Sequence, residues 1–373
     1  MSRVPAGWRR ERVDRGVAVR ARDVFALASG RDLAWLLLPR VVPVAALLAF
    51  PLLGSLVSGY WQTVVLNTLV VSLLALSWDL LASAGLVSLG QAFFFGLGGY
   101  AAGFFDARLG LPVAVGIPIA TLLGAALATA VLYPLLRLRG IYFGMITFAL
   151  PLLLMRVVET TGALGGTEGL SGLTPFPDRT TELYLLIAAV LVTVVVFRRL
   201  GTSDYGLLFQ AIRDNDRAVI ASGFDLQRRK AQVVFIAALP AAFAGAFVTH
   251  RYQFVGMPAF ALDYSTLPLT SAVIGGAGSF FGPLVGSFIL VPLSELLREF
   301  GSLRVVVYSV MLLVFTIGLP EGLFRFAARK WSQLERLVPV EEAGPGGAGA
   351  PASAREGGRA ASRPARAGEG GAP

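Results

Sequence analysis

Residues that could act in catalysis or bind a metal or a phosphate are few in this chain, and their spacing excludes several classes of enzyme. Cysteine is absent and histidine occurs once, so neither a thiolate site nor a histidine-cluster metal site can be built. Lys230 and Lys330, the only lysines, each follow an arginine, so no GxxxxGK[ST] phosphate-binding loop exists. Neither HExxH nor GxSxG is present, and we interpret His250 as an interfacial anchor. We therefore expect no catalytic residue, no metal ligand, no bound cofactor and no ATP hydrolysis by this chain.

A second group of polar residues lies within apolar sequence, in a glycine-rich run at residues 78–103. An ionisable or amide side chain at membrane depth is costly, so it commonly belongs to a transport path or to a packing network. Closely spaced glycines fit both a broken helix at a substrate site and two helices packed at short distance. A further alternative is that Asp79 caps a helix end. The residues that we assign to a translocation path or to helix packing are Asp79, Ser88, Gln91, Gly96 and Gly99.

The longest internal polar stretch, residues 201–230, carries charges of both signs in a helical pattern. Leu208, Ile212 and Val219 fall on one face of the predicted helix, and Gly223 is suited to end it. One interpretation is an amphipathic helix that lies on the membrane surface. The other is a docking helix that presents Ile212 and the preceding alanine to a cytoplasmic partner. Because adsorption to lipid favours a uniformly basic face, the mixed charge favours docking.

The elements that must position these residues are long apolar blocks. The chain has 373 residues, 55% hydrophobic and 15% charged, whereas soluble domains average about 25% charged residues. Because backbone groups in lipid must be satisfied within their own segment, such blocks predict helices. We expect an all-α, polytopic membrane bundle of about ten transmembrane helices, with eight as the lower count, and a cytoplasmic coupling helix. The blocks are residues 41–57, 63–86, 113–136, 141–154, 183–197, 233–248, 281–291 and 305–319, and residues 260–274 are either a weak span or a re-entrant element.

Basic residues predict which ends of the spans face the cytoplasm, because arginine and lysine concentrate on that side. Arginines gather before the first block, after the third, after the fifth and after the last, which places both termini in the cytoplasm. The net charge of +9 belongs to this topology, and no folded basic module indicates nucleic-acid binding. We expect a basic cytoplasmic segment at 1–31, a transmembrane domain at 32–338 and a disordered cytoplasmic tail at 339–373.

Six segments in fixed order resemble one known family over roughly residues 60–325. They read SWDLLASAGLVSLGQAFFFGLGGY, LRLRGIYFGMITFA, GGTEGLSG, FQAIRDNDRAVIASGFDLQRRK, IGGAGSFFGPLVGS and IGLPEGL. Each segment alone has low specificity, because glycine-rich membrane sequences are common, but their order is specific. The chain resembles the permease subunits of branched-chain amino acid ABC importers, of the LivM type.

This resemblance implies a permease in the inner membrane of a prokaryote that pairs with a second, related permease subunit. Two cytoplasmic ATPase subunits would bind the ATP, and an extracytoplasmic substrate-binding protein would deliver the amino acid. The stretch AIRDNDRAVIASG corresponds to the segment that couples the permease to the ATPases. The residues carried over to that role are Ala211, Ile212, Arg213, Ala218 and Gly223. The chain lacks the Glu-Ala-Ala that the general importer pattern places before the glycine, so the resemblance leaves the contact geometry open.

Alternative functions remain open at this point. One is a permease of the same fold for urea, short amides or aromatic acids, because the binding protein performs most of the selection. Another class is an ion-driven secondary transporter, which commonly shows inverted repeats and paired intramembrane charges. No repeat is evident here, and Asp79 is isolated in the sequence. A purely structural membrane subunit is disfavoured by the coupling-like stretch.

Overall fold

The computed structural model describes residues 8–12, 41–53, 57–298, 301, 303–318, 321–332 and 335–339. The chain divides into two units, one formed by Ala26–Trp331 and the other by Met1–Phe25 together with Ser332–Pro373. In the smaller unit, strand β1 (Trp8–Arg12) pairs antiparallel with β4 (Glu335–Pro339). The rest of the predicted N-terminal segment up to residue 31, and the predicted tail beyond Pro339, lie outside the described residues.

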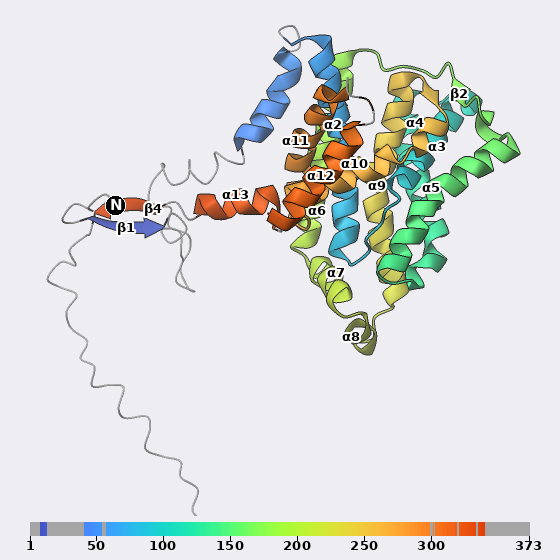
Figure 1. Cartoon of the computed structure of the whole chain (residues 1–373). Helices are drawn as coiled ribbons and strands as arrows, with labels where there is room; N and C mark the ends of the chain where they lie inside the picture. Colours follow the sequence, from blue (N-terminus) through green and yellow to red (C-terminus); the bar gives the residue numbers. More distant parts are fainter. Residues whose placement is uncertain are drawn as a thin grey trace, which may run out of the picture. The chain divides into compact units, whose positions relative to one another are not determined.

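The larger unit is mainly helical (Figure 1). Its helices are α2 (Gly59–Ser83), α3 (Gln91–Leu109), α4 (Val113–Leu132), α5 (Ile141–Thr161), α6 (Arg179–Gly201), α7 (Asp204–Asp214), α8 (Asp216–Ala221), α9 (Leu226–Tyr252), α10 (Asp263–Gly275), α11 (Gly282–Leu296), α12 (Leu303–Gly318) and α13 (Gly322–Ser332). A short apolar helix precedes them at Val41–Leu52. Four 3₁₀ segments also occur, at Phe50–Leu53, Tyr133–Arg137, Ala163–Gly165 and Met257–Phe260.

Among the described residues, five helices are long and apolar enough to cross a membrane. They are α2, α4 with its 3₁₀ extension to Arg137, α5, α6 and α9, with 21 to 27 residues each. The helical membrane bundle expected from the sequence is confirmed. By helix length and hydropathy, the described residues contain five spans and not the eight to ten that we expected. Helix α10, which covers all but the first three residues of the doubtful segment 260–274, has 13 residues. A helix needs ~20 residues to span the hydrocarbon core, so the length of α10 fits the re-entrant alternative better.

Helix α2 is the centre of the bundle, and α5 and α6 are peripheral. In the most apolar stretch of α2, 89% of the residues are buried within the chain, against 33% in α5 and in α6. The outward faces of the peripheral helices consist of leucine and valine, with Leu153 and Val195 each more than half exposed. Such faces are stable only against lipid or another apolar surface, as expected for spans at the edge of a bundle.

Helix α3 packs closely against α9. A Cβ atom added at Gly98 would overlap the carbonyl of Ala242, and one added at Gly245 would overlap the carbonyl of Phe95. Small residues permit this approach of two backbones, which is how helices associate where no hydrophobic force drives them together. The glycine density of the run at residues 78–103 therefore contributes to packing in this part of the chain.

The prediction of an all-α fold missed two short β-ladders. Besides β1–β4, strand β2 (Leu170–Ser171) pairs antiparallel with β3 (Phe254–Val255). This ladder joins the loop after α5 to the segment that follows α9. A strand of two residues has no alternating apolar pattern, so hydrophobic periodicity could not indicate it.

Candidate functional site

The segment predicted to be a docking helix folds as α7 and α8, at one end of the bundle (Figure 1). We call residues 204–223 the coupling segment. The same end carries the arginines that close the third and fifth apolar blocks and Lys230, near the start of α9, and we call it the basic end. The loop after α5, with β2, lies at the opposite end of the bundle (Figure 1).

The coupling segment is two helices and not one, because the backbone leaves the helical conformation at Asn215. Its side-chain oxygen accepts hydrogen bonds from the backbone N–H groups of Arg217 and Ala218, at 3.0 and 3.3 Å. Asparagine in this position is a typical N-cap, so it ends α7 and starts α8 in a single residue. Gly223 follows α8 with φ +82°, a left-handed conformation that suits glycine. The prediction that Gly223 stops the helix is confirmed.

One face of the coupling segment is buried and the other is open. Phe209, Ile212 and Val219 are each at most 4% exposed. Leu208, predicted to share one helix face with Ile212 and Val219, is half-buried, and the break at Asn215 places Val219 in a separate helix. Ile212, which we expected to face a partner, instead faces the bundle. The other four residues carried over from the resemblance, Ala211, Arg213, Ala218 and Gly223, are exposed. The open face also presents Leu207 and Ile220, which are 65% and 52% exposed.

The coupling segment contacts the loop between α2 and α3 at very short distance. Gly85 lies in that loop with φ +75°, and a Cβ atom added there would stand 3.0 Å from the Cα of Arg213. A side chain at position 85 would therefore push the coupling segment away from α2. Both the conformation and the space require glycine here.

Ion pairs hold α8 to the basic end of the bundle. The Asp216 carboxylate lies 3.1 Å from Nζ of Lys230 at the start of α9, and 3.1 Å from Nε of Arg139 before α5. The side chains of Lys230 and Asp216 are only 6% and 13% exposed, whereas that of Arg139 is 56% exposed. The sequence alone did not indicate that these three residues meet. The mixed charge of the stretch was the available signal, but it did not indicate which partners would meet.

A polar cavity of about 550 Å³ lies between the coupling segment and the bundle. It borders the α2–α3 loop, the connection before α5 and the start of α9. The cavity separates the polar side of the coupling segment from the bundle, whereas Phe209 and Val219 are buried in apolar contacts. The residues that line it are Ala84, Gly85, Leu86, Leu138, Arg139, Gly140, Phe143, Ile212, Arg213, Asp214, Asn215, Asp216, Arg217 and Lys230.

Asp79 is fully buried in α2, four residues before that helix ends. Its carboxylate accepts hydrogen bonds from the backbone N–H groups of Gly278 and, at 3.1 Å, of Phe280. Both belong to the tight turn between α10 and α11, where Gly278 and Phe280 have positive φ angles of 75° and 56°. The glycine-rich sequence at 275–283 therefore forms the turn between the two helices. Asp79 stabilises this turn and does not cap its own helix.

The other four residues assigned to a path or to packing also lie in the chain interior. Ser88 accepts a hydrogen bond from the N–H of Gly90 at 3.2 Å, and Gln91 accepts one from Ser77 at 3.0 Å. A Cβ atom at Gly96 would overlap the ring of Phe260, and one at Gly99 would lie 2.9 Å from the hydroxyl of Thr249. These contacts describe a packing role within the chain. A role in a translocation path stays a prediction for all five.

At the opposite end of the bundle, polar contacts clamp the loop between α5 and α6. Asp106 at the end of α3 accepts hydrogen bonds from the backbone N–H and the hydroxyl of Thr174, at 2.6 and 2.9 Å. His250 is fully buried, with Nδ1 2.9 Å from the Thr174 carbonyl, so it anchors this loop and not the membrane interface. Arg251 pairs with Glu182 at 3.2 Å. Within the described residues, no group of three or more His, Cys, Asp or Glu residues could hold a metal ion.

Comparison with known proteins places this geometry in a family. The family profile described as "Branched-chain amino acid transport system / permease component" matches residues 60–316. High-affinity branched-chain amino acid transport system permease proteins LivM of Escherichia coli and Salmonella typhimurium are 28% and 27% identical over 271 residues. Each alignment covers 64% of this chain and 64% of the relative.

Two other proteins show partial similarity. The ribose import permease protein RbsC of Bacillus subtilis is 29% identical over 121 residues, or 31% of this chain and 37% of that protein. Among solved structures, PsaBC from Streptococcus pneumoniae in complex with Fab aligns with a TM-score of 0.41 at 16% identity, covering 76% of this chain and 99% of that one. The family profile extends from α2 into α12 and includes the coupling segment and the turn held by Asp79. This multi-pass membrane protein therefore belongs to the family of permease components of branched-chain amino acid transport systems.

Proposed function

We propose that this chain is the membrane-spanning permease subunit of an ATP-driven importer and that its substrates are branched-chain amino acids. The observation that carries the proposal is the family match over residues 60–316, which includes the coupling segment. The matched relatives from Escherichia coli and Salmonella typhimurium are permeases of high-affinity branched-chain amino acid transport. The chain spans 64% of the length of these relatives.

The energy for uphill transport comes from outside this chain in the proposed mechanism. Two cytoplasmic ATPase subunits bind and hydrolyse ATP, and the permease itself holds no cofactor. A binding event shifts a permease between outward- and inward-facing states only if it favours one of them. The ATPases therefore need a mechanical contact with the bundle, and the exposed face of the coupling segment, with Ala211, Arg213, Ala218 and Gly223, supplies that contact.

Two connections transmit a movement of the coupling segment to the spans. The close approach of Gly85 to Arg213 links α7 to the end of α2, and the ion pair of Asp216 with Lys230 links α8 to α9. A displacement of the segment therefore displaces the ends of both helices. From α2, the buried Asp79 carries the movement to the α10–α11 turn through its two backbone hydrogen bonds.

The remaining partners and the topology follow from the same proposal. A second, related permease subunit completes the path, and an extracytoplasmic binding protein delivers the amino acid to the end with the clamped α5–α6 loop. The basic end faces the cytoplasm of a prokaryotic cell, and both termini lie on that side. Shorter helices, among them α3, α11, α12 and Val41–Leu52, bring the bundle to the expected eight to ten crossings.

A second substrate class is favoured by one specific observation, the similarity to the ribose import permease RbsC. A sugar importer would use the same architecture with a different binding protein. This alternative changes the cargo and leaves the coupling segment in the same role.

An ATPase assay tests the proposal and separates the two substrate classes. This chain is co-expressed with the permease, ATPase and binding-protein genes encoded beside it, and the purified complex is placed in nanodiscs. We expect the binding protein with leucine, isoleucine or valine to stimulate ATP hydrolysis at least several-fold. Stimulation by ribose or urea alone would keep the importer and replace its substrate. Failure of ATPase subunits to co-purify with this chain would contradict the proposal as a whole.

A further inference from the structure

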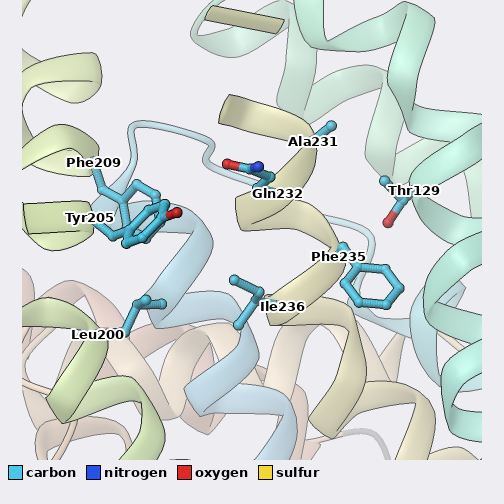
Figure 2. Close-up of a pocket in the computed structure, with 8 residues that line it drawn as sticks. All are labelled: Thr129, Leu200, Tyr205, Phe209, Ala231, Gln232, Phe235 and Ile236. Atoms are coloured by element: carbon cyan, nitrogen blue, oxygen red, sulfur yellow. The ribbon is translucent and has the colours of Figure 1, made fainter. Parts of the chain in front are cut away.

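A second cavity, of about 450 Å³, opens on the surface of the bundle near its basic end. Figure 2 shows the lining residues of α9 along the middle, with side chains of α6 and α7 on one side and Thr129 of α4 on the other. The cavity is therefore a groove whose floor is α9. Its lining residues are Thr129, Leu200, Tyr205, Phe209, Ala231, Gln232, Phe235 and Ile236.

The groove is apolar, and it lies within one membrane leaflet, whose hydrocarbon is about 15 Å thick. Its lining contains no charged side chain, and its polar atoms are confined to one hydroxyl from threonine, one from tyrosine and one amide. Phe235 and Ile236 follow Arg229 by six and seven residues, and Thr129 precedes Arg137 by eight. At about 1.5 Å per helical residue, the groove reaches roughly 10 Å from the charged boundary toward the membrane centre. An apolar groove at this depth suits a hydrocarbon chain.

Arg229 supplies a positive charge at the mouth of this groove. Its guanidinium group lies 6.0 Å from the ring of Tyr205 and 5.7 Å from the ring of Phe224, and it donates to Gln232 at 3.1 Å. Within the described part of the chain, no carboxylate lies at ion-pair distance from Arg229. The preceding arginine differs, because Arg228 pairs with Asp225 at 3.0 Å. Arg229 is thus a cation with no ion-pair partner among the described residues, and it lies beside the groove residues Tyr205 and Gln232.

We propose that this groove binds an anionic phospholipid of the cytoplasmic leaflet, with one acyl chain over α9 and its phosphate beside Arg229. An apolar channel with a cation at its headgroup end is complementary to a molecule that has an apolar chain and an anionic head. Basic sites between transmembrane helices on the cytoplasmic side are known to hold anionic lipid headgroups. The exposed Asp204, next to Tyr205, weakens the positive field on one side of the mouth.

The position of the groove gives such a lipid a consequence for the coupling segment. Tyr205 and Phe209 belong to α7, whereas Ala231, Gln232, Phe235 and Ile236 belong to α9. An acyl chain between them would contact both helices and would stabilise one arrangement of α7 against α9. This site is independent of which solute the protein carries.

Lipid binding can be measured on the full-length chain in nanodiscs that contain equal amounts of phosphatidylcholine and phosphatidylglycerol. Native mass spectrometry should show phosphatidylglycerol retained at least five-fold over phosphatidylcholine. Arg229→Gln should reduce this preference to less than two-fold, and Ala231→Trp, which fills the groove, should remove the retained lipid. Arg228→Gln is the matched control and should behave as the unmodified chain, since Arg228 is already paired and does not line the groove. Phosphatidylglycerol with a photoreactive acyl chain should label peptides that contain residues 231–236.

Each other result overturns the proposal. Equal retention of the two lipids, or an identical loss in both arginine variants, would show that Arg229 selects no anionic headgroup. Labelling elsewhere in the chain would place the lipid outside the groove. Cross-linking of Ala231→Cys to a second permease subunit, with no lipid label, would identify the groove as a protein interface. Gel filtration confirms that each variant is folded, so a folding failure is not mistaken for lost binding.

Discussion

Lys230, buried at the start of α9, places its ammonium group 3.1 Å from the carboxylate of Asp216 at the start of α8. The pair joins the coupling segment to a long helix that packs against the centre of the bundle. Both side chains are shielded from water, so each charge requires the opposite charge of its partner to be stable in this position. Arg139 is largely exposed and adds less to the free energy of the contact.

Asp216→Asn should destabilise the protein and uncouple it. The substitution leaves the Lys230 ammonium group buried without a counter-charge, which typically costs about 3–5 kcal/mol. We expect a lower Tm in detergent and a lower ratio of solute transported per ATP hydrolysed. The exchange variant Asp216→Lys with Lys230→Asp should recover much of both quantities, because it restores the opposite charges. Glu159→Gln, in an exposed pair with Arg156, is the control and should change neither.

Asp79→Asn should weaken the turn between α10 and α11. Asparagine offers one acceptor oxygen and one amide group, so it can satisfy only one of the N–H groups of Gly278 and Phe280. A buried N–H group without a partner costs about 1–3 kcal/mol, which is the expected loss in the free energy of unfolding. Denaturant titration of the detergent-solubilised protein measures this loss. The exposed Asp204→Asn is the matched control, and an equal effect in both variants would contradict the assigned contact.

Gly98→Ala and Gly245→Ala should each separate α3 from α9. The added methyl group would overlap a backbone carbonyl of the facing helix, which cannot move aside as a flexible side chain can. Overpacking of this kind lowers the free energy of unfolding by about 1–3 kcal/mol or more. We therefore expect a lower Tm and a reduced yield of folded protein. Gly116→Ala in α4 is the control, because its nearest neighbour would be 3.9 Å from the new Cβ. Unchanged stability in both α3–α9 variants would show that the helices are not so closely packed.

The two faces of the coupling segment should respond differently to substitution. Leu207→Glu and Ile220→Glu place charges on exposed positions, so they should leave the Tm of the isolated chain nearly unchanged. We expect the same variants to reduce co-purification of ATPase subunits at least several-fold. Ile212→Ala should have the opposite pattern, with a lower Tm and unchanged binding of the ATPase subunits. Removal of this buried side chain should reduce the free energy of unfolding by about 2–5 kcal/mol. Loss of ATPase binding in the Ile212 variant alone would mean that the segment docks through its buried face.

Local features of the chain could be predicted from the sequence. The long apolar blocks became α2, α4, α5, α6 and α9, because a helix in lipid satisfies its own backbone. Gly223 stops α8, and the glycine-rich turn at 275–283 separates two helices, because positive φ angles favour glycine. These features depend on residues near one another in the chain.

Contacts between distant segments could not be predicted from one sequence. The Asp79 carboxylate meets a backbone N–H group 199 residues away, and no pattern within α2 indicates that partner. Asp216 likewise pairs with charges from two other segments, and Ile212 is buried against the bundle. The two-residue ladder β2–β3 depends on the positions of the loop after α5 and the end of α9. Such relationships follow from the packing of the whole bundle.

Leucine uptake into proteoliposomes tests the central claim most directly. The vesicles contain this chain, the neighbouring permease and both ATPases, with binding protein and labelled leucine outside and ATP enclosed. We predict accumulation above the external concentration that requires ATP on the side of the coupling segment and stops when the binding protein is omitted. Uptake that ignores ATP and follows an imposed ion gradient would contradict the account.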